Sequence, residues 1–255
     1  MPKTVFITGA SSGIGAALAG HYARSGATLG LLARRRAELE SLAAPFATTT
    51  SIHAVDVADT EAVRRAAHDF MAAQGVPDVV IANAGISIGT HGGDAKDVQV
   101  LERVFRVNVI GLAATLQPFV EPMRTRGSGR LVGVASVAGV RGLPGAGAYS
   151  ASKAAVKTLL ESLRLELHGT DVRVVTISPG YIDTPMTEKN PYPMPFLMAP
   201  EKFAAKAAAA IERGASFTVI PWQMGVAGLA LRAMPNWLYD RLFARAPRKP
   251  RGLPL

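Results

Sequence analysis

Short runs rich in Val, Ile and Leu alternate with longer segments of helical periodicity along most of the chain. The expected strands are residues 3–8, 27–32, 51–55, 78–82, 129–136, 171–177 and 217–220. The expected helices are residues 14–25, 35–44, 59–74, 97–125, 150–168 and 200–212. Parallel strands need a crossover connection, which is usually a helix. The alternation therefore predicts an α/β fold, a doubly wound parallel sheet of about seven strands with helices on both faces.

The composition agrees with one globular body and narrows the possible chemistry. Of the 255 residues, 49% are hydrophobic and 18% are charged, which allows a large buried core. Cysteine is absent, which excludes disulfide bonds and thiolate metal ligands, and the five histidines have no metal-ligand spacing. We therefore expect no metal.

Neither a membrane-spanning helix nor a nucleic-acid partner is expected. No apolar run reaches the ~18 residues of a spanning helix, and residues 1–8 lead into a glycine turn rather than a secretory signal. The net charge is +9, but residues 229–255 alone carry six basic side chains against one acidic side chain. No basic face with interleaved aromatic residues occurs elsewhere. The sequence predicts a cytoplasmic protein.

The first expected strand runs directly into TGASSGIG, residues 8–15. Glycine at positions 9, 13 and 15 allows a tight turn and a close approach of the backbone to a pyrophosphate, which the following helix N-terminus attracts. A glycine turn between a strand and a helix is by itself ordinary. After the first strand of an alternating pattern, however, it predicts dinucleotide binding. The candidate residues of this loop are Gly9, Ser11, Ser12, Gly13, Ile14 and Gly15.

Ser136, Tyr149 and Lys153 carry the side chains of a proton-transfer site. Tyr149 and Lys153 are four residues apart, so on a helix they share one face. A phenol with a pKa near ~10 is a weak acid or base at neutral pH, and a nearby ammonium group favours the phenolate. Ser136 ends a strand, and the Gly-rich segment behind it would bring its hydroxyl to Tyr149. The same Tyr and Lys spacing also occurs on solvated helices.

Asn108 stands in an apolar stripe of the expected helix 97–125. Its neighbours at steps of three and four residues are Leu101, Phe105, Leu112, Leu116 and Phe119. A buried amide is costly without hydrogen-bond partners. Two explanations stay open: a role in the site, or satisfaction by neighbouring backbone at a helix kink near Gly111.

These motifs together resemble the short-chain dehydrogenase/reductase family, in its branch of about 250 residues. The resemblance covers residues 3–220 and rests on TGASSGIG, IANAG at residues 81–85, Asn108, Ser136, YSASK at residues 149–153 and PGYIDT at residues 179–184. It implies a Rossmann-type sheet with the strand order 3-2-1-4-5-6-7. Residues 1–220 would form the dinucleotide-binding and catalytic domain, and residues 221–255 an extension.

The resemblance also implies roles for the candidate residues. Tyr149 would be the general acid or base, Ser136 would hold the substrate oxygen, and Lys153 would lower the pKa of the tyrosine and bind the nicotinamide ribose. Asn108 would complete the tetrad through a water molecule. The further cofactor-binding residues implied are Asp56, Val57, Asn83, Ala84, Gly85, Pro179, Gly180, Ile182 and Thr184. Asp56 is equally well explained as an ordinary turn residue.

The end of the second expected strand indicates which cofactor is used. NAD enzymes place an acidic residue there for the ribose 2′-hydroxyl, whereas this chain has Ala33 followed by Arg34, Arg35 and Arg36. An arginine offers charge and a planar donor fork to a 2′-phosphate. We therefore expect that the cofactor is NADP, bound through Arg34 and Arg35, rather than NAD. Some of the three arginines would belong to a solvated turn, and Ser12 replaces a basic residue found in many NADP-using relatives.

For two apolar segments, the sequence allows more than one contact. Residues 181–198 occupy the family's substrate loop, where Met186, Met194, Phe196, Leu197 and Met198 favour a lipophilic carbonyl compound, or else pack the loop on the body or on another subunit. The tail, residues 221–255, combines Trp, Leu and Phe with arginines. Either it closes the substrate pocket or packs on another subunit, or it lies in the interface of a membrane's inner face.

The sequence predicts an NADP-dependent oxidoreductase that transfers a hydride between NADP(H) and a lipophilic carbonyl or alcohol substrate. The partners expected are this small molecule and further copies of the chain, in a homodimer or a homotetramer. A dinucleotide-binding sensor without turnover is the alternative. The four residues Asn108, Ser136, Tyr149 and Lys153 favour the enzyme.

Overall fold

The computed structural model describes residues 2–188 and 190–251. They contain a seven-stranded parallel sheet in the order β3-β2-β1-β4-β5-β6-β7, as the resemblance implies. The strands are β1 (Thr4–Thr8), β2 (Thr28–Ala33), β3 (Thr50–Ala54), β4 (Val79–Ala82), β5 (Gly129–Val134), β6 (Val172–Pro179) and β7 (Phe217–Ile220). The sheet is the Rossmann-type doubly wound arrangement, with its change of direction between β1 and β4.

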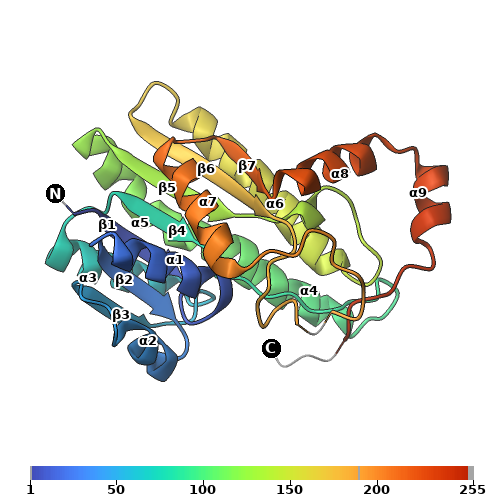
Figure 1. Cartoon of the computed structure of the whole chain (residues 1–255), viewed down its shortest axis with the longest axis horizontal. Helices are drawn as coiled ribbons and strands as arrows, with labels where there is room; N and C mark the ends of the chain where they lie inside the picture. The colour runs from blue at the N-terminus through green and yellow to red at the C-terminus, as the bar shows by residue number, and fades with distance from the viewer. Residues whose placement is uncertain (1, 189, 252–255) are drawn as a thin grey trace.

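Helices cover both faces of this sheet (Figure 1). The helices are α1 (Gly13–Arg24), α2 (Arg36–Ala43), α3 (Thr60–Gln74), α4 (Asp97–Phe105), the π-helix η1 (Arg106–Ile110), α5 (Gly111–Arg126), the 3₁₀-helix η2 (Val137–Gly139), α6 (Gly147–Glu166), α7 (Pro200–Glu212), α8 (Trp222–Ala233) and α9 (Asn236–Phe243). The apolar side chains of α1, α2 and α7 belong to one core cluster, and those of α3, α5 and α6 to a second.

The first strand shows how one sequence supplies both cores. Val5 and Ile7 belong to the cluster under α1 and α7, while Phe6 between them belongs to the cluster under α3 and α5. All three side chains are fully buried. Successive side chains of a strand point to opposite faces, so a central parallel strand needs apolar residues throughout.

The expected strands and helices are found close to the predicted bounds, with one difference. Residues 97–125 form α4, η1 and α5 in succession rather than one regular helix. The π-helical turn, residues 106–110, contains Asn108. Gly111 then lets α5 lie against the end of β3, since a Cβ there would stand 2.9 Å from the Val57 carbonyl oxygen. The change of helix type therefore occurs where the amide is buried.

Helices α8 and α9 stand away from the sheet at one end of the molecule (Figure 1). Arg141 holds them there: its guanidinium donates to the carbonyl oxygens of Leu231 and Met234 at 2.7 and 2.6 Å. The Tyr239 hydroxyl donates to the Gly142 carbonyl oxygen at 2.6 Å. Of the predicted tail, residues 252–255 lie outside the described residues. Within the described part of the chain, no helix is long and apolar enough to cross a membrane.

Candidate active site

A cleft of about 370 Å³ opens at the carboxyl ends of the central strands. Of the predicted site residues, it is lined by Gly9, Ser11, Ser12, Gly13, Ile14, Arg34, Arg35, Asp56, Val57, Asn83, Ala84, Gly85, Ser136, Tyr149, Lys153, Pro179, Gly180, Ile182 and Thr184. The two predicted residues outside this lining are Gly15 and Asn108, which lie behind it. Segments that are far apart in the sequence therefore meet in one place, as ligand sites do in such sheets.

The glycine turn after β1 forms a cradle that side chains would fill. A Cβ on Gly9 would stand 2.7 Å from Ala84 Cα, and a Cβ on Gly15 would stand 2.2 Å from the Gly9 carbonyl oxygen. Gly9 and Gly13 also have φ angles of 67° and 55°, in the left-handed region that favours glycine. Helix α1 then begins at the cleft, with no side chain capping its free N–H groups. The residues present fit a dinucleotide, whose pyrophosphate such a helix start binds.

Asn83 ties the cradle to the neighbouring strand. Its Nδ2 donates to the carbonyl oxygens of Thr8 and Gly9 at 3.1 and 3.2 Å. The Thr8 hydroxyl in turn accepts from the backbone N–H groups of Asn83 and Ala84. These bonds hold the β1–α1 turn in place before any ligand binds, which reduces the ordering cost of binding.

Tyr149 and Ser136 meet on one wall of the cleft. Tyr149 is on the first turn of α6, and Ser136 directly follows β5 and caps η2, accepting from Ala138 N at 3.1 Å. Gly139 makes the approach possible, because a Cβ there would stand 2.6 Å from the Lys153 backbone carbon. Burial raises the pKa of the Tyr149 phenol, and its hydrogen bond with Ser136 opposes this rise.

Lys153 is buried beside these hydroxyls, and its ammonium group is held by the end of β5. Its Nζ donates to the Val134 carbonyl oxygen at 2.8 Å and lies 5.8 Å from the centroid of the Tyr149 ring. The pKa of Tyr149 is raised rather than lowered, because burial outweighs the other influences. Burial also lowers the pKa of Lys153 to about 8. The role of Lys153 in lowering the pKa of the tyrosine therefore stays a prediction.

Asn108 is satisfied by its surroundings. Its Oδ1 accepts from Ile86 N at 2.8 Å, and its Nδ2 donates to the Ile86 carbonyl oxygen at 2.9 Å and to Ser152 Oγ at 3.0 Å. The side chain is fully buried, so these bonds meet the cost of burying an amide. Asn108 thus joins η1 to the segment after β4 and to α6, at Ser152, which directly precedes Lys153.

The arginines after β2 separate into two kinds. Arg34 and Arg35 line the cleft, and Arg35 Nη2 donates to Ser11 Oγ at 3.0 Å and to Ser12 Oγ at 3.4 Å. Arg36 instead pairs with Glu40 on the surface of α2 at 3.5 Å. The basic turn therefore faces the glycine cradle with two of its three side chains, and the third is a solvated surface charge.

Asp56 serves both the turn and the cleft. Its Oδ1 accepts from Ala58 N at 2.9 Å, and its Oδ2 accepts from Arg103 Nη2 at 2.8 Å. Burial would raise the pKa of Asp56, but the hydrogen bonds from Ala58 and Arg103 lower it below the ordinary value. Asp56 is therefore both an ordinary turn residue, through its bond with Ala58, and part of the cleft lining.

Comparison with known proteins shows to which protein family the chain belongs. The model of the short chain dehydrogenase family matches residues 3–193. The chain belongs to this family. An uncharacterized oxidoreductase of Myxococcus xanthus is 39% identical over 93% of the chain and 95% of its own length. An uncharacterized oxidoreductase of Mycobacterium tuberculosis is 37% identical over 86% of the chain and 88% of its own length.

Solved structures of short-chain dehydrogenases have the same architecture. One from Burkholderia phymatum in complex with NAD matches 98% of both chains with a TM-score of 0.82 and 25% identity. An alcohol dehydrogenase from Thermococcus sibiricus, complexed with 5-hydroxy-NADP, covers 86% of this chain and 95% of its own with a TM-score of 0.76 and 27% identity. The protein is thus a nucleotide-binding oxidoreductase of the short-chain dehydrogenase family.

The loop of residues 181–198 in this short-chain dehydrogenase shows both contacts that the sequence left open, with the cleft and with the body. Of its five apolar residues, Met186 alone lines the cleft among the described residues. Met198 pairs with Ile182 and packs on the core, and Phe196 and Leu197 are exposed. The hydrogen bond from Met198 N to the Tyr181 carbonyl oxygen holds the end of the loop beside its beginning. Lys189 of the predicted loop lies outside the described residues.

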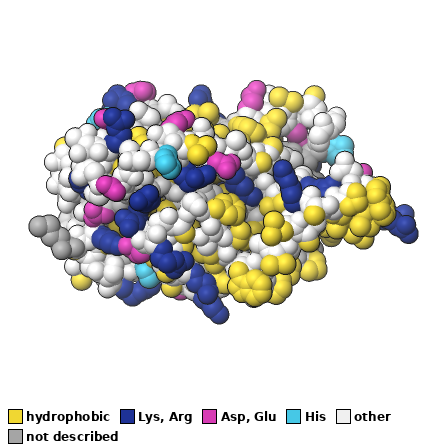
Figure 2. All heavy atoms as spheres, turned by 90° about the horizontal axis from the view of Figure 1, so that it is seen from above, with side chains coloured by type: hydrophobic (Ala, Val, Ile, Leu, Met, Phe, Trp, Pro, Cys, Tyr) yellow, Lys and Arg dark blue, Asp and Glu magenta, His cyan; other side chains and the backbone are white. Residues whose placement is uncertain are grey.

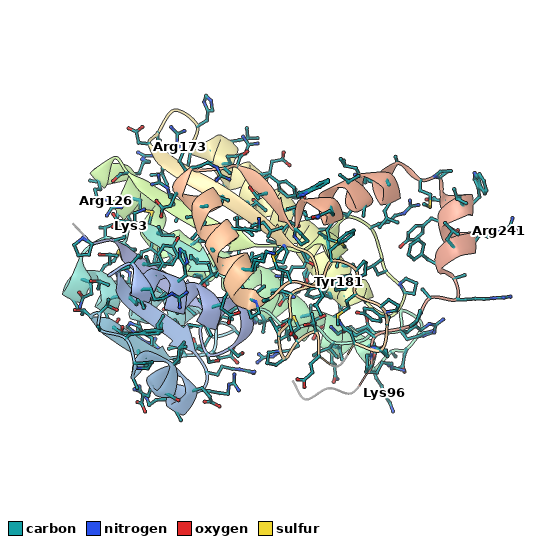
Figure 3. All side chains as sticks on the ribbon, in the orientation of Figure 1. Lys3, Lys96, Arg126, Arg173, Tyr181 and Arg241 are labelled. Atoms are coloured by element: carbon teal, nitrogen blue, oxygen red, sulfur yellow. The ribbon has the colours of Figure 1, made fainter. Side chains whose placement is uncertain are left out.

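Tyrosines of the same loop approach the catalytic wall instead. The rings of Tyr181 and Tyr192 lie 6.4 Å apart, and Figure 3 shows Tyr181 among the loops at this end of the sheet. Burial raises the pKa of Tyr192 to about 12, with smaller contributions from Tyr181 and Tyr149. These two tyrosines lie near Tyr149 but, as far as the chain is described, outside the lining of the cleft.

Several cleft residues of the short-chain dehydrogenase were not predicted. They are Ala33, Val55, Ile86, Val107, Val134, Ala135, Pro185 and Thr187. Most lie next to a predicted residue at a strand end. The predicted ends of the strands were therefore the sequence signal that could have found them. A further ammonium group, on Lys249, lies 5.8 Å from the Tyr149 ring centroid. Within the described residues, no group of three or more potential metal ligands is found.

Proposed function

We propose that this short-chain dehydrogenase transfers a hydride between NADP(H) and a carbonyl or alcohol substrate. The observation that carries the proposal is the meeting of the Tyr149 and Ser136 hydroxyl groups on the wall of a cleft whose floor is a glycine cradle. A nicotinamide cofactor supplies the hydride when it is bound. The chain's own residues bind and orient the reactants and move a proton.

The proposed proton transfer uses the two hydroxyl groups together. Ser136 donates a hydrogen bond to the substrate oxygen and holds it against Tyr149. In reduction, the Tyr149 phenol donates its proton to that oxygen; in oxidation, the phenolate accepts a proton from it. The Tyr149 phenol, whose pKa is raised by burial, is protonated at neutral pH and is therefore in the form that donates. Lys153 is placed to bind the ribose and to influence the phenol.

Choice of NADP over NAD is supported by the basic end of β2. Arg34 lines the cleft, and Arg35 reaches the hydroxyl groups of Ser11 and Ser12 across it. Guanidinium groups and hydroxyl groups together suit a phosphate ester. No acidic side chain stands at Ala33, where NAD enzymes have one. We propose that the 2′-phosphate lies between Arg34, Arg35 and Ser11.

Arg34→Ala is expected to weaken NADPH binding about tenfold or more, since a charged hydrogen bond is lost. NADH binding should change little, because NADH has no 2′-phosphate. Fluorescence titration of each reduced cofactor measures both dissociation constants. Arg36→Ala is the matched control, because Arg36 pairs with Glu40 outside the cleft. Equal weakening of the two cofactors by Arg34→Ala would contradict the assignment.

The reaction itself is tested with a panel of aldehydes and ketones of increasing apolar size in the presence of NADPH. Oxidation of NADPH is followed by absorbance. Turnover that rises with apolar size would support a lipophilic substrate, for which Met186 and Ile86 in the lining are the present support. NADPH binding without turnover of any compound would favour the sensor instead.

An apolar stripe on α8 supports self-association. Trp222, Val226 and Leu229 lie at steps of four and three residues on one face of α8, and 69%, 57% and 72% of their surfaces are exposed. They therefore do not close the pocket of their own chain. Figure 2 shows hydrophobic side chains gathered toward the end of the molecule that carries α8 and α9. We propose that this stripe packs on a second copy of the chain in a homodimer or a homotetramer.

Leu229→Glu is expected to raise the dissociation constant of the oligomer about tenfold or more, because a leucine that would be buried in the proposed interface is replaced by a charge. Sedimentation velocity over a concentration series measures this shift. Ala230→Glu, an exposed substitution at the next position of α8, is the control. A monomeric wild type that sediments with anionic vesicles, and releases with salt, would assign the stripe to a membrane instead.

A further inference from the structure

The chain returns from α9 to the catalytic end of the molecule. We call residues 247–251 the C-terminal strap. The Pro250 carbonyl oxygen accepts from Gly89 N at 3.0 Å. Glycine makes room for the strap on both sides: a Cβ on Gly89 would stand 2.3 Å from the Lys249 carbonyl oxygen, and a Cβ on Gly145 would stand 2.7 Å from Arg248 Cβ. The strap therefore lies in close contact with the segments before α4 and before α6.

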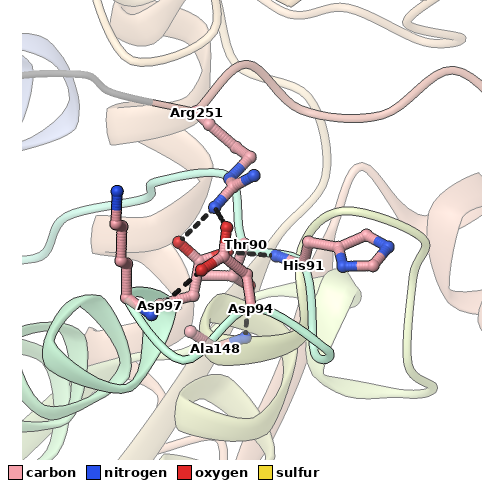
Figure 4. A network of polar contacts seen from close by, with 7 residues as sticks. Thr90, His91, Asp94, Asp97, Ala148 and Arg251 are labelled. Atoms are coloured by element: carbon pink, nitrogen blue, oxygen red, sulfur yellow. Dashed lines mark hydrogen bonds and ion pairs between the residues drawn. The ribbon is translucent and has the colours of Figure 1, made fainter.

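Arg251 fastens the end of the strap (Figure 4). Its Nη2 donates to Asp94 Oδ2 at 2.5 Å and to Asp97 Oδ1 at 2.9 Å. Asp97 also accepts from His91 N. The Thr90 hydroxyl, beside this network, accepts from Ala148 N at 3.3 Å. Ala148 precedes Tyr149, so the network connects the strap with the helix start that carries the catalytic phenol.

Lys249, in the middle of the strap, points its ammonium group toward that phenol. Its Nζ lies 5.8 Å from the Tyr149 ring centroid and donates to Ser87 Oγ at 2.7 Å. Among the residues that the structure describes, Lys249 forms no ion pair, since the nearby carboxylates of Asp94 and Asp97 bind Arg251. Burial lowers the pKa of Lys249 to about 8. A half-buried ammonium without a carboxylate partner attracts an anion.

The place of this ammonium group indicates which molecule it faces. No residue of the strap appears in the lining of the nucleotide cleft, as far as the chain is described. Lys249 approaches Tyr149 together with Ser87, whereas Lys153 is held by the Val134 carbonyl oxygen inside the cleft. A group bound by Lys249 would therefore belong to the second reactant and lie near the Tyr149 ring.

We propose that Lys249 is a specificity-determining residue that binds an anionic group, such as a carboxylate, on the carbonyl substrate. The proposal rests on the proposed carbonyl reduction and narrows its substrate class to carbonyl compounds that carry an acidic group. Lys249 supplies the charge, Ser87 orients the ammonium group, and the bonds of Arg251 to Asp94 and Asp97 hold the strap in place. The rest of the substrate contacts the apolar part of the lining.

The test compares ketones that differ only in charge. Wild type, Lys249→Met and Lys249→Arg are assayed with NADPH and the para and meta isomers of acetylbenzoate, and with the matching neutral acetylbenzamides. We expect Lys249→Met to lower kcat/KM for the acetylbenzoates about tenfold or more, because a charged hydrogen bond is lost. The value for the acetylbenzamides should stay within about threefold, and Lys249→Arg should keep most of the preference for the acid. Arg248→Met, an exposed charge of the same strap, is the control.

A second measurement separates the role of Lys249 from the activity itself. Isothermal titration of the enzyme and NADP⁺ complex with acetylbenzoate measures the anion contact without turnover, because the oxidised cofactor has no hydride to transfer, and Lys249→Met should abolish the heat. Equal loss of kcat/KM for acids and amides would show that Lys249 acts on Tyr149, and unchanged values would show that it contacts neither; both results overturn the proposal. Binding that depends on Lys249, without reduction of any carbonyl compound, would keep the anion site and overturn only the proposed reaction.

Discussion

Tyr149→Phe is expected to reduce kcat for carbonyl reduction by about 10²- to 10⁴-fold, which is the usual contribution of a positioned general acid. The substitution removes the hydroxyl group and keeps the ring, so the packing of α6 should persist. Tyr149 and Ser136 line the same wall of the cleft, and the phenol, whose pKa is raised by burial, is protonated at neutral pH. The assay is NADPH oxidation with the best ketone of the panel.

Two controls separate chemistry from binding in this experiment. The dissociation constant of NADPH should remain within a few-fold of the wild-type value, because the phenol is one contact among many in the cleft. Tyr22→Phe is the matched variant, since Tyr22 is another buried tyrosine but lies in the core under α1. Its kcat should be close to that of the wild type. A Tyr149→Phe enzyme that retains turnover would remove Tyr149 from the proposed proton transfer.

Gly15→Ala is expected to weaken NADPH binding about hundredfold. This factor corresponds to the upper end of the usual free-energy cost of inserting an extra methyl group into a packed site. The added Cβ would stand 2.2 Å from the Gly9 carbonyl oxygen and 2.7 Å from Asn83 Nδ2. The first of these atoms is backbone, which cannot move without opening the cradle that Asn83 holds. Fluorescence titration measures the binding, and thermal denaturation measures the accompanying loss of stability.

Gly20→Ala on the same helix is the control for this substitution. A Cβ on Gly20 would stand 3.6 Å from Arg24 Nη1 at the nearest, which is ordinary contact with a flexible side chain. Alanine is favoured over glycine inside a helix by up to about 1 kcal/mol, so Gly20→Ala should leave binding unchanged and raise the melting temperature slightly. If both substitutions affect binding equally, close packing at Gly15 is not the cause.

Much of the nucleotide cleft was predictable because local patterns carry its constraints. The alternation of strands and helices specifies a parallel sheet, and the carboxyl ends of its strands must then meet at one edge. Residues directly after strands, such as Gly9, Asn83 and Ser136, are therefore brought together by the fold itself. Glycines that permit close approach, and a Tyr and a Lys at helical spacing, are likewise visible in the chain.

Other features were decided by contacts that no local pattern records. Asn108 stands in an apolar stripe, but its partners are the backbone of Ile86 and the Ser152 hydroxyl, which only the packing of η1 against α6 supplies. The apolar residues of the loop 181–198 face away from the cleft for the most part, because Met198 pairs with Ile182. Burial, rather than the spacing of Tyr149 and Lys153, determines the direction of the tyrosine pKa.

The sequence by itself determined the sheet, the glycine cradle and the candidate catalytic side chains, because each depends on residues that are neighbours along the chain or follow directly from a strand or helix pattern. Only the tertiary structure decided the position of Lys249, whose hydrogen bond to Ser87 joins residues 162 positions apart. That contact requires α9, the strap and the glycines at 89 and 145 to be packed together. Such long-range pairs follow from the shape of the folded body, which a local pattern does not specify.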